Sequence, residues 1–407
     1  MTQDATTTVT PAGVHRNVGL LAVAQALFMC ITTMAIATTP LAGHALLGVD
    51  KTLATLPLVL NHVGIMVMTV PASLLMGRIG RRAGFTIGAM IALASGAVSL
   101  YAIQLQNFEL LCLGALMTGF SSAFAWYYRF AAADVADEAY RPKAISLVMA
   151  GGLVAGIVGP QTAKWAVHWL DPMVFAGVYV MTMVFAAAAI IVIQGIQIPR
   201  LSLAQRKEGG RPMSEIIRQP TYIVALCSSM FGYGVMTLVM SATPLAMLAC
   251  GFNFDNSATV IQGHVVGMFL PSFFTGSLIT RFGVLRIIAI GALIQMGCSA
   301  VNLAGIDFMN FFIANVLVGI GWNFTYVGGS TLLTTTYRPA ERAKVQASHD
   351  FMVYFTTAMA AGLSGVLQAR AGWEIVNLAA LPLMGFVLIA ALGLSRYQAR
   401  QRTFAGA

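Results

Sequence analysis

Long apolar stretches separated by short polar ones recur along the whole chain. Stretches of spanning length fall at residues 18–43, 54–77, 84–104, 108–130, 144–168, 172–196, 221–249, 258–279, 284–304, 308–334, 343–369 and 373–395. An α-helix needs about 20 mostly apolar residues to cross the hydrocarbon core of a bilayer. The pattern therefore predicts an all-α membrane protein with twelve transmembrane helices.

Composition agrees with this interpretation. Only 9% of the 407 residues are charged and 58% are apolar, whereas a soluble protein carries charge on about 25% of its residues. These values exclude a soluble domain, a disordered chain and a nucleic-acid binder. A disulfide framework is also excluded, because the cysteines have no paired spacing. They are Cys30, Cys112, Cys227, Cys250 and Cys298.

The basic residues predict the orientation in the membrane. When the loops alternate between the two sides, every Lys and Arg except Lys51, Lys164 and Arg370 falls on the side of the N-terminus. Basic residues concentrate on the cytoplasmic side of membrane proteins. We therefore expect a bacterial cytoplasmic membrane protein with both termini in the cytoplasm. The first apolar stretch lacks the features of a cleaved signal and should remain.

An internal repeat divides the chain near its middle. Thr-Pro-Leu-Ala occurs at 39–42 and again at 243–246, and Gly-Arg-Ile-Gly at 77–80 is echoed by Thr-Arg-Phe-Gly at 280–283. Tyr-Arg-Pro-Lys at 140–143 is echoed by Tyr-Arg-Pro-Ala at 337–340. The expected organisation is a cytoplasmic tail at 1–17, a six-helix bundle at 18–197, a cytoplasmic linker at 198–220, a second six-helix bundle at 221–395 and a cytoplasmic tail at 396–407.

The loop at 77–84 also resembles a known family. Its sequence, Gly-Arg-Ile-Gly-Arg-Arg-Ala-Gly, is similar to the loop signature between the second and third helices of the major facilitator superfamily. The members of that family usually carry an Asp near the position of Arg78, and this chain has none there. The resemblance implies a major facilitator fold of two six-helix bundles, with a substrate site between them near the bilayer midplane.

Two pairs of soft ligands lie on consecutive helices of the second bundle. Met236 and Met240 share one helix, and His264 and Met268 share the next. Residues four apart project from one face of a helix. Thioether sulfur and imidazole suit Cu(I), whereas harder cations prefer carboxylates. Methionine is also a common gap filler in helix bundles, but a histidine within a membrane is more often functional.

This arrangement resembles the signature of the CcoA-like copper importers, a branch of the major facilitators. The resemblance implies that Met236, Met240, His264 and Met268 bind copper as a transported substrate, for haem–copper oxidase assembly. Cys250 also resembles a cysteine of that branch. No resident cofactor and no nucleic-acid partner are implied, and the protein should function as a monomer in the lipid bilayer. A sister group in the branch imports riboflavin.

His62 and Met66 in the second helix repeat the His-x-x-x-Met spacing. They are additional metal candidates that would form a second half-site. Alignment of the two halves, however, places Asn61 opposite His264, and one residue is a rotation of about 100° around a helix. The sequence leaves open whether both histidines face the transport path.

Several charged residues are candidates for gating or coupling. Arg129 and Asp134 lie near the cytoplasmic end of the fourth helix, and His349 and Asp350 lie near the start of the eleventh. Arg78 belongs to the loop signature. Buried charges in a bundle usually pair, so a gate between Arg129 and a carboxylate is one hypothesis and a static ion pair is the other. Proton coupling would involve Asp350, His349 or His264.

A second hypothesis for the substrate is an organic solute such as riboflavin or a drug. In that case aromatic side chains would line the cavity and the methionines would be its walls. The candidates are Trp126, Tyr127, Tyr128, Trp322 and Tyr326. An enzyme is not expected, because no nucleophile–base constellation and no Gly-rich phosphate loop stands out.

Overall fold

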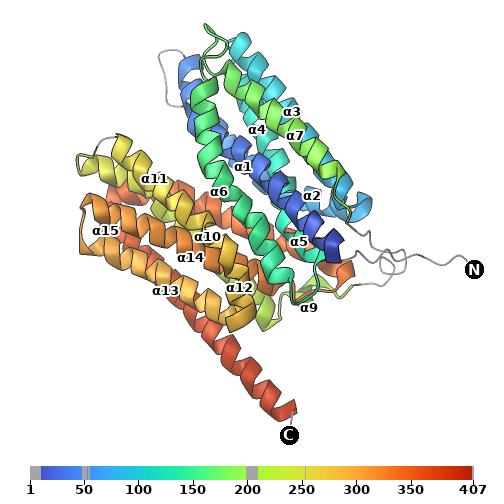
Figure 1. Ribbon diagram of the computed structural model, residues 1–407. Coiled ribbons are helices and arrows are strands. Elements are labelled where there is room, and N and C mark those ends of the chain that lie inside the picture. Colours follow the sequence, from blue (N-terminus) through green and yellow to red (C-terminus); the bar gives the residue numbers. More distant parts are fainter. Residues whose placement is uncertain (1–10, 48–52, 54–55, 199–209, 253, 406–407) are drawn as a thin grey trace, which may run out of the picture. The chain divides into compact units, whose positions relative to one another are not determined.

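The computed structural model describes residues 11–47, 53, 56–198, 210–252 and 254–405. Regular structure in these ranges is helical throughout (Figure 1). The helices are α1 (Pro11–Leu46), α2 (Leu56–Ile79), α3 (Arg81–Gln104), α4 (Phe108–Ala125), α5 (Tyr128–Val135), α6 (Arg141–Ala166), α7 (Ala176–Gln194), α9 (Met213–Ile216), α10 (Pro220–Ala249), α11 (Phe254–Phe269), α12 (Ser272–Phe282), α13 (Val284–Ala304), α14 (Phe308–Leu333), η1 (Pro339–Glu341) and α15 (Arg342–Ala405).

Twelve helical segments in the described part of the chain are long and apolar enough to cross a membrane. This confirms the predicted all-α class and the predicted number of spans. The apolar sequence explains why, since a helix satisfies all of its own backbone hydrogen bonds and so tolerates a medium without water.

The chain divides into two compact units. The first comprises residues 1–137 and 147–209, and the second comprises residues 138–146 and 210–407. The first residues of α6 therefore pack with the second unit, where the Ser146 hydroxyl donates to the Ser272 carbonyl and accepts from the Gly276 amide at 3.1 Å. Of the predicted linker at 198–220, residues 199–209 lie outside the described residues, as do residues 1–10 of the predicted tail.

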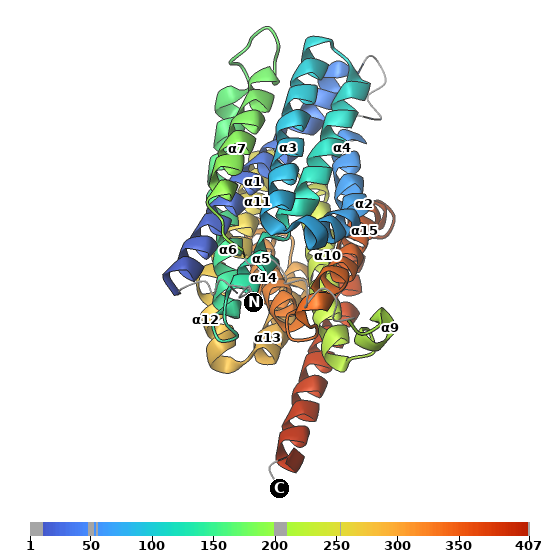
Figure 2. The same cartoon turned by 90° about the vertical axis from the view of Figure 1, so that its right-hand side faces the viewer.

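Close approach of backbones holds the first unit together. Helix α3 lies between α4 and α7 (Figure 2). Helices α2 and α4 meet at Gly64 and Gly119, where a Cβ atom added to Gly119 would lie 2.1 Å from the carbonyl oxygen of Asn61. Small residues of this kind let membrane helices pack on one another, since apolar side chains gain little from leaving lipid.

Two of the predicted spans are interrupted helices. The span predicted at 108–130 breaks between α4 and α5 at Trp126 and Tyr127, and the span predicted at 258–279 breaks between α11 and α12 at Leu270 and Pro271. Pro271 has no amide hydrogen to donate to the carbonyl four residues before it, which explains the second break. The spacing of apolar residues does not predict such a local interruption of a helix.

The ends of the chain are more helical than the sequence suggested. The expected tail at 1–17 contains the start of α1 at Pro11, and the expected tail at 396–407 is helical as far as Ala405. No Gly or Pro occurs between residues 394 and 405, so nothing in that segment ends the helix. Within α15, Gly372 has a φ of 81° and separates the two predicted spans at 343–369 and 373–395.

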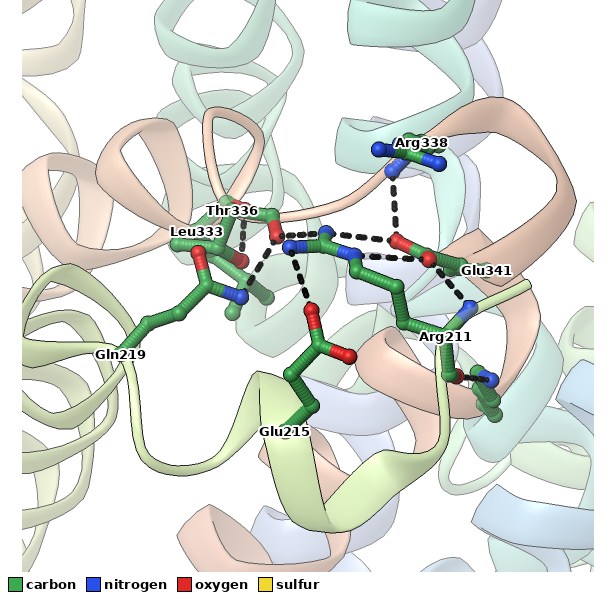
Figure 3. A network of polar contacts seen from close by, with 8 residues as sticks. Arg211, Glu215, Gln219, Leu333, Thr336, Arg338 and Glu341 are labelled. Carbon is green, nitrogen blue, oxygen red and sulfur yellow. Dashed lines mark hydrogen bonds and ion pairs between the residues drawn. The ribbon is translucent and has the colours of Figure 1, made fainter.

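A polar contact within the second unit ties the segment before α9 to the loop between α14 and α15 (Figure 3). The guanidinium of Arg211 donates to both oxygens of the Glu341 carboxylate, at 3.0 and 2.8 Å. The carboxylate also accepts from the backbone amides of Arg211 at 2.7 Å and Arg338 at 2.9 Å. Glu341 is completely buried, and its charge is balanced by these four donors.

Carbonyl groups complete this contact. The Thr336 carbonyl accepts from Arg211 at 3.0 Å and from Gln219 at 3.2 Å (Figure 3), and Lys344 donates to the Arg211 carbonyl. Hydrogen bonds to Glu341 raise the pKa of Arg211 above its usual value. Charge-assisted hydrogen bonds therefore join the segment before α9, the loop after α14 and the first turn of α15. Such bonds are stronger than neutral ones.

Candidate functional site

Five aromatic rings from four helices gather in the second unit, and we call them the aromatic cluster. They are Tyr233 of α10, Phe269 of α11, Trp322 and Tyr326 of α14, and Tyr354 of α15. The rings of Trp322 and Tyr326 stack with centroids 5.2 Å apart and planes at 15°. Tyr233 meets both of them edge-on, at 5.4 and 5.3 Å. Tyr233 is the partly exposed member of the cluster, and the other four rings are buried. Aromatic rings of this kind pair with the ring of a flat aromatic ligand by stacking or by edge-to-face contact.

Polar atoms without partners lie beside these rings. The indole nitrogen of Trp322 is buried and has no hydrogen-bond partner. Gln295 of α13 donates to the Gly232 carbonyl at 3.1 Å, while its own side-chain oxygen has no partner. Gln295 also packs against Gly321. Because Gly232 precedes Tyr233 and Gly321 precedes Trp322, the Gln295 side chain lies beside the backbone next to both of these aromatic residues. Unsatisfied buried groups cost stability, and a ligand could supply the missing partners.

The break between α11 and α12 is stabilised by Asn323 of α14. Its side-chain amide donates to the Met268 carbonyl at 2.7 Å and to the Ser272 hydroxyl at 2.5 Å. Its oxygen accepts from the Thr275 hydroxyl at 2.7 Å. One buried asparagine thus satisfies groups on both sides of the interruption. Discontinuous helices of this kind often accompany substrate sites in transporters.

His264 faces α14. Its imidazole is completely buried, and its Nδ1 lies 2.9 Å from the Asn315 carbonyl. Because a carbonyl only accepts, Nδ1 carries the hydrogen and Nε2 carries the free lone pair. Nε2 has no hydrogen-bond partner. A backbone carbonyl that holds the second nitrogen is also how metal-binding histidines are oriented.

The three methionines of the candidate metal set differ in exposure. Met236 and Met268 are buried, and Met240 is partly exposed. Both of their helices pack on α14, where Asn315 contacts His264 through its carbonyl and Thr243 through its side chain at 3.1 Å. The four predicted ligands thus lie on two helices that share a neighbour.

The other metal candidates are more exposed. His62 lies on the exposed side of α2, with its Nδ1 2.9 Å from the Leu58 carbonyl of the same helix. Met66 is partly exposed, and the neighbouring Asn61 is the residue that turns into the unit, at 3.4 Å from the Ala115 carbonyl. Cys250 follows the last residue of α10 and is exposed. Among the described residues, no three His, Cys, Asp or Glu side chains form a group that could hold a metal.

A buried ion pair in the first unit involves one of the predicted gating residues. Asp134, at the end of α5, contacts Arg81, the first residue of α3, at 3.1 Å, and the two side chains are 8% and 3% exposed. Arg129 donates to the Trp126 carbonyl at the α4–α5 break and lies over the Phe130 ring. Arg78 is exposed at the end of α2. The partner of Asp134 is therefore Arg81, a residue of the loop signature that was not among the predicted gating residues.

The aromatic residues predicted in the first unit are packed into it. The Trp126 ring contacts Phe28 at 5.8 Å, and the Tyr128 ring contacts Phe85 at 4.6 Å. The Tyr127 hydroxyl donates to the Thr69 carbonyl at 3.1 Å. Of the five aromatics proposed for an organic solute, the two in the second unit belong to the aromatic cluster.

A family model described as Major Facilitator Superfamily matches residues 21–301. The chain belongs to the major facilitator superfamily. Membership makes it a multi-pass membrane transporter and not an enzyme.

The chain is similar to one curated transporter in sequence and to two solved transporters in structure. The chain is 38% identical over 377 residues to the riboflavin transporter RfnT of Brucella anthropi. The aligned region covers 92% of this chain and 94% of RfnT. Among solved structures, the fucose:proton symporter FucP of E. coli has a TM-score of 0.76 at 17% identity, with 92% and 97% of the two chains covered. A bacterial homologue of the iron transporter ferroportin has a TM-score of 0.73 at 10% identity, with 93% and 99% covered. The two structures show the shared fold alone.

Sequence reasoning missed several residues of the candidate site. Tyr233, Gln295, Asn315 and Asn323 were not among the candidates, although all four lie within predicted spans. A polar side chain in an apolar span is itself a signal, because it must find a partner inside the bundle. The amides on α13 and α14 gave that signal, whereas nothing in the sequence distinguished Tyr233 from other aromatic residues.

Proposed function

We propose that this chain is a carrier for a flat heteroaromatic solute of the riboflavin type, working by alternating access of its two units. The relative RfnT, at 38% identity over nearly the whole chain, supports this substrate. So does the aromatic cluster, the single structural observation on which the proposal rests. Copper import, the first hypothesis from the sequence, gains no support from RfnT.

The chemistry of the solute matches the cluster. The isoalloxazine ring of riboflavin is flat, aromatic and edged with hydrogen-bond donors and acceptors. Stacking of a heteroaromatic base on an aromatic side chain contributes roughly 1–3 kcal/mol. The Trp322 indole nitrogen would supply a donor and the Gln295 oxygen an acceptor, since both are buried without partners.

Uptake of labelled riboflavin tests the proposal directly. Cells that cannot synthesise riboflavin and lack their own importer should grow on low riboflavin when they express this chain. Purified protein in liposomes should exchange labelled for unlabelled riboflavin. Failure of this exchange, with correctly folded protein and RfnT active in the same assay, would remove riboflavin as the substrate.

One observation favours copper as a second candidate. The buried Nε2 of His264 has a free lone pair, and its Nδ1 is held by a carbonyl. Met236 and Met268, also buried, are soft ligands on the two helices that meet α14. This donor set suits Cu(I).

A double variant distinguishes the two substrates. We expect Met236→Leu/His264→Leu to keep at least half of riboflavin uptake, because neither residue belongs to the aromatic cluster. A copper importer would lose copper accumulation in the same variant, measured as cell metal content and oxidase activity. Two results together would favour copper. The wild type would take up no riboflavin, and the double variant would lower copper-dependent oxidase activity.

We also propose the cytoplasmic membrane as the location, with both termini in the cytoplasm. The distribution of basic residues supports this orientation. Cys250 follows the seventh span and is exposed, so it should face the outside. In intact cells a small, membrane-impermeant maleimide should label the wild type and should fail to label Cys250→Ser.

The matched control for this labelling is Cys227→Ser, which removes a cysteine in the interior of α10. It should be labelled like the wild type. Labelling of Cys250 that requires permeabilised cells would instead place the end of α10 in the cytoplasm and reverse the orientation.

A further inference from the structure

A cavity of about 430 Å³ lies in the second unit, between the end of α13 and the break in α15. Small-molecule sites in proteins usually measure about 300–1,000 Å³. Its walls include Asn302, Leu303 and Ile306 from the end of α13 and the loop after it, and Gly372, Trp373 and Glu374 from the break in α15. It shares no residue with the aromatic cluster or the candidate metal set. It is also separate from the gating candidates His349 and Asp350, which lie earlier in α15, where they are buried and contact each other at 2.8 Å.

Two buried polar atoms in the walls of the cavity have no hydrogen-bond partner among the described residues. They are the side-chain oxygen of Asn302 and the indole nitrogen of Trp373, and the two residues are 2% and 9% exposed. An unpaired buried polar group costs free energy. Because both side chains line the cavity, a molecule bound there is the source from which the missing partners can come.

A second asparagine holds these two side chains in place. The Asn302 amide donates to the side-chain oxygen of Asn377 at 2.8 Å, and the Asn377 amide donates to the Trp373 carbonyl at 2.9 Å. The Trp373 ring packs against that of Phe311, with centroids 5.4 Å apart. The Asn302 oxygen can only accept a hydrogen bond, and the Trp373 indole nitrogen can only donate one. The cavity wall thus offers one acceptor and one donor in fixed positions.

A carboxylate gives the cavity a preference for positive charge. Of the described residues that line it, Glu374 alone is charged. Its side chain is exposed, and it forms no ion pair with another described residue. An ammonium group donates three hydrogen bonds, for which the Glu374 carboxylate and the Asn302 oxygen are acceptors. The Trp373 ring also attracts a cation that lies over its face.

The cavity lies at the depth of lipid head groups. Helix α13 has 21 residues and is therefore about 31 Å long, which matches the hydrocarbon core of about 30 Å. The end of α13 at Ala304 accordingly marks the boundary of that core, where tryptophan is enriched. Leu303 and Ile306 are 39% and 58% exposed, so the cavity has an apolar side that suits acyl chains.

We propose that this cavity binds a phosphoethanolamine head group, carried by a phospholipid of the bilayer. The ammonium group donates to Glu374 and Asn302, and a phosphate oxygen accepts from the Trp373 indole nitrogen. The acyl chains lie against Leu303 and Ile306. Binding involves no covalent step and does not depend on the proposed transport substrate. Free phosphoethanolamine has the same head-group chemistry without the chains, so the tests include both sources.

The first test measures lipid binding to purified, delipidated full-length protein by native mass spectrometry. The wild type should bind phosphatidylethanolamine more tightly than phosphatidylglycerol with the same acyl chains, because the glycerol head group has no ammonium. Glu374→Gln should weaken binding of phosphatidylethanolamine about fivefold, the upper range for an exposed ion pair, and should not weaken binding of phosphatidylglycerol. Glu109→Gln removes an exposed carboxylate of the first unit and should match the wild type.

Two results of this test would overturn the proposal. One is equal affinity of the wild type and Glu374→Gln for phosphatidylethanolamine. The other is an equal loss of both lipids in Glu374→Gln, because the carboxylate would then act on the fold and not on the ammonium group.

The second test uses tryptophan fluorescence to separate the lipid from its free head group. Phosphatidylethanolamine added to the delipidated protein should change the emission of the wild type and of Trp169→Phe, which lacks an exposed tryptophan of the first unit, but not that of Trp373→Phe. A response of Trp373 to free phosphoethanolamine as well would show that the head group is sufficient. A response to the lipid alone would show that the acyl chains are also needed. Both results support the site, and no response of Trp373 to either ligand would overturn it.

Discussion

Replacement of Tyr233 by alanine is expected to weaken riboflavin binding by about 10- to 100-fold. Tyr233 contacts Trp322, Tyr326 and Tyr354 and is the partly exposed member of the aromatic cluster, so we expect it to be the ring that contacts the ligand first. Loss of one stacking partner costs roughly 1–3 kcal/mol, and each 1.4 kcal/mol is about tenfold in affinity. Quenching of riboflavin fluorescence on titration with purified protein measures the effect.

Two variants separate stacking from damage to the fold. Tyr233→Phe retains the ring and should bind riboflavin within about threefold of the wild type if stacking dominates. Phe231→Ala removes a ring two residues earlier in α10 that packs instead against Phe386, and it should leave affinity unchanged. Equal loss of binding in Phe231→Ala and Tyr233→Ala would show that the effect is one of stability and not of recognition.

Glu341→Gln is expected to destabilise the second unit by about 3 kcal/mol, toward the low end for a broken buried ion pair. Four nitrogen donors point at the Glu341 carboxylate (Figure 3). A glutamine would place its own amide hydrogens against some of them. The Arg211 side chain is 23% exposed, so water would relieve part of the loss. Thermal unfolding of purified protein, followed by thiol exposure, measures it.

The control is Glu215→Gln, which alters the second acidic partner of Arg211. Glu215 lies 3.9 Å from the guanidinium and its side chain is 55% exposed, and exposed pairs contribute about 0–1 kcal/mol. We expect almost no change in unfolding temperature. A similar shift for both variants would mean that Glu341 acts as one more surface charge and that its burial has no energetic consequence.

Much of the fold could be predicted from apolar length alone. Every predicted span corresponds to a helical segment, because the bilayer allows few alternatives to a helix of this length. The breaks at Trp126 and at Pro271, and the helical ends near Pro11 and Ala405, could not be predicted in this way. They depend on local hydrogen bonds, such as those of Asn323 to the groups on either side of Pro271, to which average hydropathy is insensitive.

The candidate site was harder to predict than the fold. Spacing alone suggested Met236, Met240, His264 and Met268, and the structure shows how His264 is oriented by the Asn315 carbonyl. Spacing says nothing about contacts between distant helices, so Tyr233 was overlooked although it touches three other rings. The pairing of Asp134 with Arg81 was missed for the same reason, since the two residues are far apart in the sequence.

The glycine contact between α2 and α4 limits how this protein can be engineered. Alanine scanning is a common way to make membrane proteins more heat-resistant, since alanine favours helix over glycine. At Gly119 the added methyl group would lie 2.1 Å from the Asn61 carbonyl, and at Gly64 it would lie 2.5 Å from the Leu116 carbonyl. Backbone atoms cannot rotate away as side chains do. Substitutions that usually improve a helix would therefore push these two helices apart, and these positions should be left out of a stabilising library.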